Sequence, residues 1–321
     1  MADRKFVPVT SDTTNPQKIA APGIDPAKAR LMRLATYASV TVACVLIAIK
    51  SWAWFGSGSV ALLSSLVDSI LDALASIVNL IAVRHALEPA DAEHRFGHGK
   101  VESLASLGQA AFIGGSAVFL VFEAVHRMIR PQELGSVNAG ISVMTISIVL
   151  TLMLVLFQKF VVKRTGSIAI SADSLHYRSD ILVNVGIIAA LVAVSALGWS
   201  FVDPLAAFAV AAYILYGAWT IARQSFDMLM DRELPEEERR NIRDLVVSHD
   251  EVHDMHDLRT RSAGINSFIQ FHIELDHHIT VIHAHQIADD VEARVRVAYP
   301  EAEVIIHQDP QGLEEGHQDY T

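Results

Sequence analysis

The feature that most constrains the fold of this chain is a series of long uncharged stretches in its first 222 residues. Five of them contain no Asp, Glu, Lys or Arg, and a sixth, Ser57–Val83, is apolar apart from Asp68 and Asp72. The five are Leu34–Ile49, Ser103–Phe122, Leu134–Gln158, Ile181–Val202 and Pro204–Ala222. Most approach the ~20 residues that an α-helix needs to cross ~30 Å of hydrocarbon. One or two such runs fit a soluble helical domain, whereas six in succession predict a polytopic membrane protein.

The expected spans cover residues 34–55, 58–84, 102–126, 137–162, 177–198 and 202–223. Their orientation follows from Lys and Arg, which are in excess on cytoplasmic connections. One side collects the basic residues of the N-terminal segment and of the second and fourth connections: Arg4, Lys5, Lys18, Lys28, Arg30, Arg33, Arg84, Arg95, Lys100, Lys159, Lys163 and Arg164. The short connections on the other side carry only Arg127 and Arg130. Both termini are therefore predicted to be cytoplasmic.

The two ends of the chain are polar. Residues 1–30 lack the apolar core and the cleavage site of a signal peptide. We expect them to form a flexible cytoplasmic arm, with a short helix from about Pro26 leading into the first span. Residues 311–321 are expected to form a flexible tail.

Charge separates the chain into two parts. Residues 1–230 carry 17 Lys and Arg against 15 Asp and Glu, whereas residues 231–321 carry 8 against 21, a net charge of −13. The second part also contains 10 of the 15 His. A domain this acidic is a poor partner for nucleic acid, which needs a basic face. The only cysteine, Cys44, excludes a disulfide framework, thiolate zinc fingers and iron–sulfur clusters. The chain thus divides into a six-helix transmembrane domain at 31–226 and a cytoplasmic domain at 227–310.

The acidic part has the pattern of a small α/β domain. Helices are predicted at Pro235–Ser248 and Ile282–Ala298, and strands at Asp257–Ser262, Ser267–Leu275 and Glu303–His307. A turn at Gly264-Ile265-Asn266 would join the first two strands as a hairpin. The order helix, strand, strand, helix, strand predicts an open sheet with helices on one face.

One candidate metal site lies inside the predicted membrane domain. Asp68 and Asp72 are four residues apart on the second span, and His176 and Asp180 have the same spacing at the start of the fifth, so each pair shares one helical face. A carboxylate at membrane depth costs about 3 kcal/mol unless it is paired or hydrated. Three carboxylates and one imidazole suit Zn²⁺ and related divalent cations such as Cd²⁺ or Fe²⁺. The alternative is that the acids are hydrogen-bonded structural residues and that His176 and Asp180 cap a helix.

A second candidate is the loop motif Asp91-x2-His94-x3-His98, which places three metal-ligand residues in one short connection. Its spacing fits a metal site and a solvated polar loop equally well.

A third candidate lies in the acidic domain, where metal-ligand residues come from different predicted elements. Ten His beside many acids make some metal affinity unavoidable, so their number alone is weak evidence. Dispersion over several elements is typical of a folded metal site, and His307-Gln308-Asp309 at a strand end is the sharpest part. The candidate ligands are His256, His272, His285, His307 and Asp309.

Local sequence strings carry a resemblance to a known family. They are Val67-Asp-Ser69, Asp72, Ala90-Asp91, Phe96-Gly-His-Gly-Lys100, Ala172-Asp-Ser-Leu-His-Tyr-Arg-Ser-Asp180, His256-Asp-Leu-Arg-Thr-Arg261, Phe268-Ile-Gln-Phe-His272 and Val304-Ile-Ile-His-Gln-Asp-Pro310. With six spans and a small α/β domain, they resemble the cation diffusion facilitators, and within them the bacterial zinc/ferrous-iron efflux pumps. The resemblance covers residues ~30–310.

This resemblance implies roles for the three clusters. The transported-ion site would comprise Asp68, Asp72, His176 and Asp180, and a second metal site would comprise Asp91, His94 and His98. A binuclear site in the C-terminal domain would comprise His256, His272, His285, His307 and Asp309, with Asp309 bridging two ions. The resemblance further implies a homodimer, a ferredoxin-like (metallochaperone-like) C-terminal α+β domain, and a charge interlock between Lys100 and Asp231. Ser174-Leu175 departs from the bulky residue that relatives carry at a hydrophobic gate.

The expected function is therefore efflux of a divalent cation (Zn²⁺, also Fe²⁺ or Cd²⁺) across the bacterial inner membrane. Protons would be exchanged by alternating access, and metal binding to the cytoplasmic domain would regulate export. The expected partners are divalent metal ions, protons, the lipid bilayer and a second copy of the chain, and no nucleic acid. Two other classes stay open at this point, an intramembrane metalloenzyme and a non-transporting sensor or scaffold. The chain lacks H-E-x-x-H and G-x-S-x-G, and four protein ligands leave no position for a catalytic water, which favours a transporter over an enzyme. The physiological metal among Zn²⁺, Fe²⁺, Cd²⁺ and Mn²⁺ and the proton stoichiometry are left open by the sequence.

Overall fold

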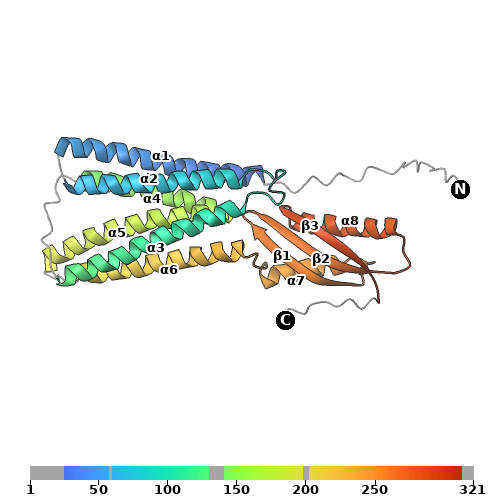
Figure 1. Cartoon of the computed structure of the whole chain (residues 1–321). Coiled ribbons are helices and arrows are strands. Elements are labelled where there is room, and N and C mark those ends of the chain that lie inside the picture. The colour runs from blue at the N-terminus through green and yellow to red at the C-terminus, as the bar shows by residue number, and fades with distance from the viewer. Residues whose placement is uncertain (1–24, 58–59, 130–140, 198–201, 313–321) are drawn as a thin grey trace.

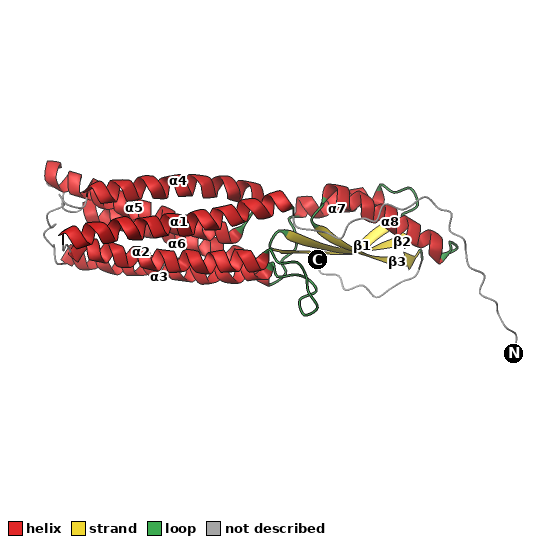
Figure 2. Ribbon diagram, turned by 90° about the horizontal axis from the view of Figure 1, so that it is seen from above, coloured by secondary structure: helices red, strands yellow, loops and turns green. Residues whose placement is uncertain are grey.

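The computed structural model describes residues 25–57, 60–129, 141–197 and 202–312. Six long helices come first and run along one another as a bundle (Figures 1 and 2). They are α1 (Pro26–Ser57), α2 (Val60–Ala86), α3 (Lys100–Ile129), α4 (Ile141–Thr165), α5 (Ile168–Leu197) and α6 (Val202–Leu229). Wherever they are described, the uncharged stretches therefore form helices, as predicted. The expected arm before residue 25, the start of the fourth span at 137–140 and the expected tail after residue 312 lie outside the described residues.

Within the described residues, five helices are long and apolar enough to cross a membrane: α1, α2, α3, α4 and α6. The remaining long helix, α5, carries the polar residues Asp173, His176, Arg178 and Asp180 in its first half. The expected short helix from Pro26 is continuous with the first span, because α1 begins at Pro26.

Small side chains allow α3, α5 and α6 to pack closely. Ala110 and Ala117 of α3, Ala172 of α5 and Ala218 of α6 are buried in one apolar cluster. Between membrane helices there is little hydrophobic driving force, so small residues that let backbones approach are the usual basis of association. Gly217 of α6 shows this closeness, because a Cβ atom there would lie 2.7 Å from Leu175 Cδ1.

The C-terminal part is an α+β domain beyond one end of the bundle (Figure 1). Its elements are α7 (Glu236–Val247), β1 (Asp254–Ala263), β2 (Asn266–Leu275), α8 (Val281–Ala298) and β3 (Ala302–Pro310). The strands pair in the order β1-β2-β3, with β1 antiparallel and β3 parallel to β2. The predicted order of helices and strands is confirmed, although β1 begins at Asp254 rather than Asp257.

One face of this sheet forms the core of the domain. Alternate residues of β2, among them Phe271 and Ile273, are buried together with Ile242 of α7 and Val291 of α8. The intervening residues of β2 therefore point to the opposite face, because successive side chains of a strand alternate. That second face carries the histidines described below.

The loop between α2 and α3 packs against the turn between β1 and β2. A Cβ atom on Gly99 would lie 2.1 Å from the carbonyl oxygen of Ala263, so only glycine fits there. Phe96 contacts Phe268 edge to face, and the Arg261 guanidinium lies 4.7 Å and 4.5 Å from the two ring centroids. These contacts join the membrane bundle to the C-terminal domain.

Candidate metal centres

The first centre lies where α2 and α5 meet inside the bundle. Asp72, His176 and Asp180 each offer a ligand atom, and these atoms lie within 4.8 Å of one another. His176 Nε2 lies 2.9 Å from Asp72 Oδ1, and both side chains are largely buried. Asp180 Oδ2 is also buried and has no hydrogen-bond partner among the described residues. A buried carboxylate oxygen without a partner is costly and calls for an unseen ligand such as a cation.

Asp68, the fourth ligand suggested by the sequence, is not part of this group. It lies one turn before Asp72 on α2 and is exposed. Three of the four expected residues are thus brought together, and the fourth lies next to them on the same helical face.

A buried polar network holds α5 in place beside this centre. Asp173 Oδ2 accepts hydrogen bonds from Ser39 Oγ at 2.6 Å and from Gln158 Nε2 at 2.7 Å. One turn further along α5, Tyr177 Oη lies 2.8 Å from Ser76 Oγ of α2. These bonds tie α1, α2 and α4 to α5, so they fix the helix that carries His176 and Asp180.

The sequence analysis did not select Lys50, which lies near the end of α1. Its Nζ donates to Ser69 Oγ at 2.7 Å and to the carbonyl oxygen of Ser65 at 3.1 Å, both on α2. Its charge interacts with the carboxylates of Asp68, Asp72 and Asp180. The signal was present in the sequence, because a lysine inside a predicted span is by itself a candidate functional residue.

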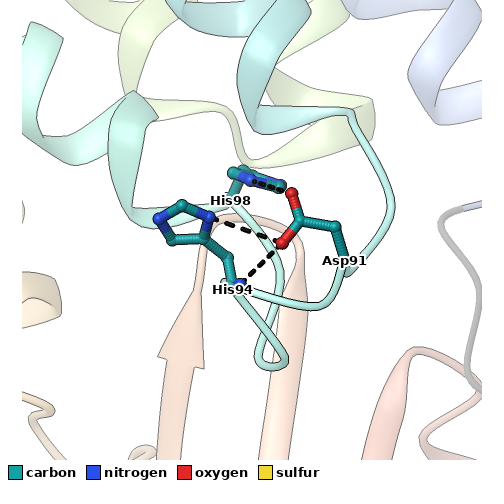
Figure 3. Close-up of side chains that lie close together, drawn as sticks. All are labelled: Asp91, His94 and His98. Atoms are coloured by element: carbon teal, nitrogen blue, oxygen red, sulfur yellow. Dashed lines mark hydrogen bonds and ion pairs between the residues drawn. The ribbon is translucent and has the colours of Figure 1, made fainter.

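The second centre is the loop between α2 and α3, shown in Figure 3. The Asp91 carboxylate lies between two imidazoles, with Oδ1 3.5 Å from His94 Nδ1 and Oδ2 3.4 Å from His98 Nε2. Asp91 Oδ1 also accepts backbone hydrogen bonds from His94 at 2.6 Å and Glu93 at 2.9 Å. The bond from the His94 amide is the main reason why the pKa of Asp91 lies below its usual range. The loop therefore holds this carboxylate ionised between two potential nitrogen ligands.

The third centre follows a single row across the sheet. His256 of β1 pairs in register with His272 of β2, which pairs with His307 of β3. Asp309 lies two residues beyond His307 and faces all three rings. Its Oδ2 is 2.8 Å from His272 Nδ1 and 3.3 Å from His256 Nε2, whereas its Oδ1 is 3.1 Å from His307 Nε2. Sheet register explains why residues so distant in sequence meet here.

His285, which the sequence placed in this third set, lies apart from the row. It is on α8, its side chain is 72% exposed, and its Nε2 lies 3.7 Å from Asp289 Oδ2. The helix belongs to the core face of the sheet, whereas the row lies on the other face.

Two acids next to this row were missed. Asp254 pairs with Glu274, which pairs with Asp309, so a second row runs beside the histidines. Asp254, His256 and Glu274 can also present ligand atoms within 4.8 Å of one another. The signal was an acid two residues from a histidine in each strand: Asp254-Met-His256, His272-Ile-Glu274 and His307-Gln-Asp309.

Comparison with known proteins places the chain in a family. The family described as the cation efflux transmembrane domain matches residues 36–230, and the one described as the cation efflux protein cytoplasmic domain matches residues 234–311. The chain therefore belongs to the cation diffusion facilitators, a family of membrane transporters rather than enzymes.

Relatives refine this placement. The chain is 47% identical over 287 residues to the cation-efflux pump FieF of Pectobacterium atrosepticum, which covers 89% of this chain and 95% of the relative. It is 44% identical to FieF of Klebsiella pneumoniae, over 88% of this chain and 94% of the relative. A solved structure of CzrB matches 25% of this chain and 99% of its own length, at 34% identity and a TM-score of 0.24. Within the family, the chain is of the FieF type.

Proposed function

We propose that this protein exports a divalent cation, Zn²⁺ in the first place and also Fe²⁺ or Cd²⁺, across the bacterial inner membrane in exchange for protons. The observation that carries this proposal is the meeting of Asp72, His176 and Asp180 where α2 and α5 lie side by side inside the bundle. Ionisable residues within the membrane-spanning segments of a protein mark ion pathways. Here they come from two different helices, so a relative movement of α2 and α5 changes the site.

The ligand set favours a divalent transition metal. One imidazole and two carboxylates converge, and rotation of the exposed Asp68 side chain supplies a third carboxylate from the same face of α2. Such a mixed set suits Zn²⁺, Fe²⁺ and Cd²⁺ better than Mg²⁺, which prefers an all-oxygen octahedral shell.

Proton exchange follows from the same ligands. A metal binds only to deprotonated carboxylates and a neutral imidazole, so loading releases protons and protonation releases the metal. When the site opens alternately to the two sides of the membrane, this competition couples the two fluxes in opposite directions. Lys50 adds one positive charge beside the carboxylates and limits how tightly they hold a cation.

The C-terminal domain is proposed to regulate export as part of a homodimer. The two oxygens of Asp309 face different imidazoles, which is the arrangement of a carboxylate that bridges two ions. Residues 231–321 carry a balance of −13, so two such domains repel each other until bound cations reduce the charge. Both termini and this domain are assigned to the cytoplasm, because the basic residues of the connections gather on that side.

The test is Zn²⁺ flux into proteoliposomes that contain a zinc dye. Asp72→Asn and Asp180→Asn should each reduce initial uptake at least tenfold, because each removes a charged ligand. The matched control is Asp227→Asn near the end of α6, where the carboxylate pairs with Arg232 far from the site; this variant should transport like the unmodified protein. Unchanged uptake by Asp72→Asn and Asp180→Asn would overturn the assignment.

A further inference from the structure

We propose that His85 is a fourth metal ligand of the loop centre and that Glu88 orients it. This inference rests on metal binding by Asp91, His94 and His98, and it adds a residue that lies outside their motif. His85 belongs to the last turn of α2, so the added ligand would connect this helix to the loop.

The imidazole rings of His85, His94 and His98 have the spacing expected of ligands of one metal ion. The ring centroids of His85 and His98 are 4.7 Å apart, and those of His94 and His98 are also 4.7 Å apart. Two imidazoles on one tetrahedral zinc ion, with Zn–N bonds of about 2.0 Å, have centroids about 5 Å apart. All three rings line a single cavity of about 350 Å³, which Phe96 and Phe268 also line together with Lys100 and Arg261, whose charges are paired with Asp231.

Glu88 selects the nitrogen of His85 that is available to a metal. Glu88 Oε2 lies 2.7 Å from His85 Nδ1, a contact that favours the tautomer with its proton on this nitrogen. The electron pair is then on Nε2. A carboxylate that accepts from the second ring nitrogen is the usual partner of a metal-bound histidine, because it fixes the tautomer and the ring orientation.

His98 supplies independent evidence that this cavity holds a ligand. Its side chain is 5% exposed, and its Nδ1 is buried with no hydrogen-bond partner among the described residues. A buried ring nitrogen without a partner is unfavourable in a folded protein. Its Nε2 already lies 3.4 Å from Asp91 Oδ2, so the ring would have to reorient around an ion for Nδ1 to gain a partner.

A fourth protein ligand would complete the coordination shell of this centre and so favour a structural role. His85 is not among the residues whose ligand atoms lie within 4.8 Å of one another at this centre, so its ring and the Glu88 carboxylate, both about half exposed, would have to turn together toward the loop to bind the ion. Three imidazoles and one carboxylate fill a tetrahedral shell and leave no open position, as in structural zinc sites. The ion would clamp the end of α2 to the loop whose Phe96 packs on the C-terminal domain. We therefore assign the loop ion to a structural clamp rather than to cargo.

Cobalt binding tests the fourth ligand directly, because tetrahedral Co²⁺ absorbs visible light far more strongly than six-coordinate Co²⁺. The parent is the full chain in nanodiscs with Asp72→Asn, Asp180→Asn, His256→Ala, His272→Ala and Asp309→Asn, which disables the intramembrane centre and both ligand groups of the C-terminal sheet. In this parent, His85→Ala should weaken Co²⁺ and Zn²⁺ binding by about 10- to 100-fold and reduce the visible band, and Glu88→Gln should weaken binding about tenfold. The control is His283→Ala, since His283 pairs with Glu251 in the same way on the surface of the C-terminal domain.

Two results would overturn the inference. One is a His85→Ala protein with the affinity and spectrum of the parent. The other is a parent whose cobalt band survives His94→Ala with His98→Ala, since the signal would then not come from the loop. Neither depends on transport, because the parent lacks the transport ligands; Zn²⁺ flux through an otherwise unmodified protein tests the proposed function separately. An unchanged unfolding temperature of metal-free His85→Ala shows that the fold is intact.

Discussion

Lys100 Nζ lies 2.9 Å from Asp231 Oδ1, which joins the first residue of α3 to the segment that follows α6. Arg261 of β1 reaches the same oxygen at 3.3 Å. The pairing that the sequence resemblance implied is therefore present, and the structure adds a third partner from the C-terminal domain. Asp231 adopts a positive φ of 54°, which an aspartate tolerates better than most residues and which turns the chain between the two domains.

This junction predicts a pH dependence of stability. Partial burial acts to raise the pKa of Asp231, but the hydrogen bonds from Lys100 and Arg261 outweigh it and hold the pKa below its usual range. Because the folded-state pKa is the lower one, the stabilisation is complete above the ordinary carboxyl pKa and is lost as pH falls through the folded-state value. The pair is half exposed, so we expect Asp231→Asn to cost only about 0.5–1 kcal/mol at pH 7.

Thermal unfolding in nanodiscs from pH 7 to pH 3 measures this effect. The difference between the unmodified protein and Asp231→Asn should shrink toward the acid end, where both carry a neutral side chain at this position. A difference that stays constant across this range would show that the charge of Asp231 is not what stabilises the junction.

The contact at Gly99 predicts a steric coupling between the domains. Gly99→Ala places a Cβ atom against the Ala263 carbonyl and forces the loop away from the β1–β2 turn. We expect faster proteolysis of the segment between α6 and α7 and reduced Zn²⁺ flux. Gly108→Ala is the control, because a Cβ atom at Gly108 of α3 meets nothing within 4 Å. Equal proteolysis of the two variants would contradict a tight junction.

Lys50 is predicted to set the strength with which the intramembrane site holds its cation. Removing one positive charge near three carboxylates should tighten cation binding by about tenfold and slow release by a similar factor. Lys50→Met should therefore lower both the KM for Zn²⁺ and the maximal flux, whereas Lys50→Arg, which keeps the charge, should retain most of the flux. An unchanged KM and an unchanged maximal flux in Lys50→Met would show that Lys50 does not set the strength of cation binding.

In the proposed homodimer, the C-terminal row of histidines predicts a movement between the two copies of the domain. Spin labels introduced with Asp290→Cys on the exposed side of α8, in a Cys44→Ser background, report the distance between partners. Zn²⁺ should shorten this distance, because bound cations reduce the mutual repulsion. Asp309→Asn should abolish the shift, since it weakens the bridging carboxylate. A distance between the labels that does not change when Zn²⁺ is added would refute regulation by this domain.

The fold was largely readable from the sequence because its strongest signals are local. An uncharged stretch of about 20 residues specifies a membrane helix by itself, and the order of helices and strands in the acidic part follows from periodicity. The helical pairs Asp68/Asp72 and His176/Asp180 were visible for the same reason, as four-residue spacing fixes a face.

The remaining features of the candidate sites depend on contacts between segments that are far apart in the sequence. The row of His256, His272 and His307 requires the register of three strands, so Glu274 escaped notice although it lies in the neighbouring row. His285 was grouped with that row because the face of α8 that meets the sheet could not be inferred from spacing. Lys50 was treated as the end of an uncharged stretch, yet it contacts Ser69 of α2, next to Asp68.

The central claim is that a proton gradient drives the cation through the site formed by Asp72, His176 and Asp180. The most direct measurement is Zn²⁺ accumulation in proteoliposomes with an acidic lumen, recorded together with luminal pH. The account predicts uptake above the external Zn²⁺ concentration, an alkaline shift of the lumen in step with uptake, and loss of both with a protonophore or with Asp72→Asn. Zn²⁺ that only equilibrates across the membrane, with no opposing proton movement, would contradict it.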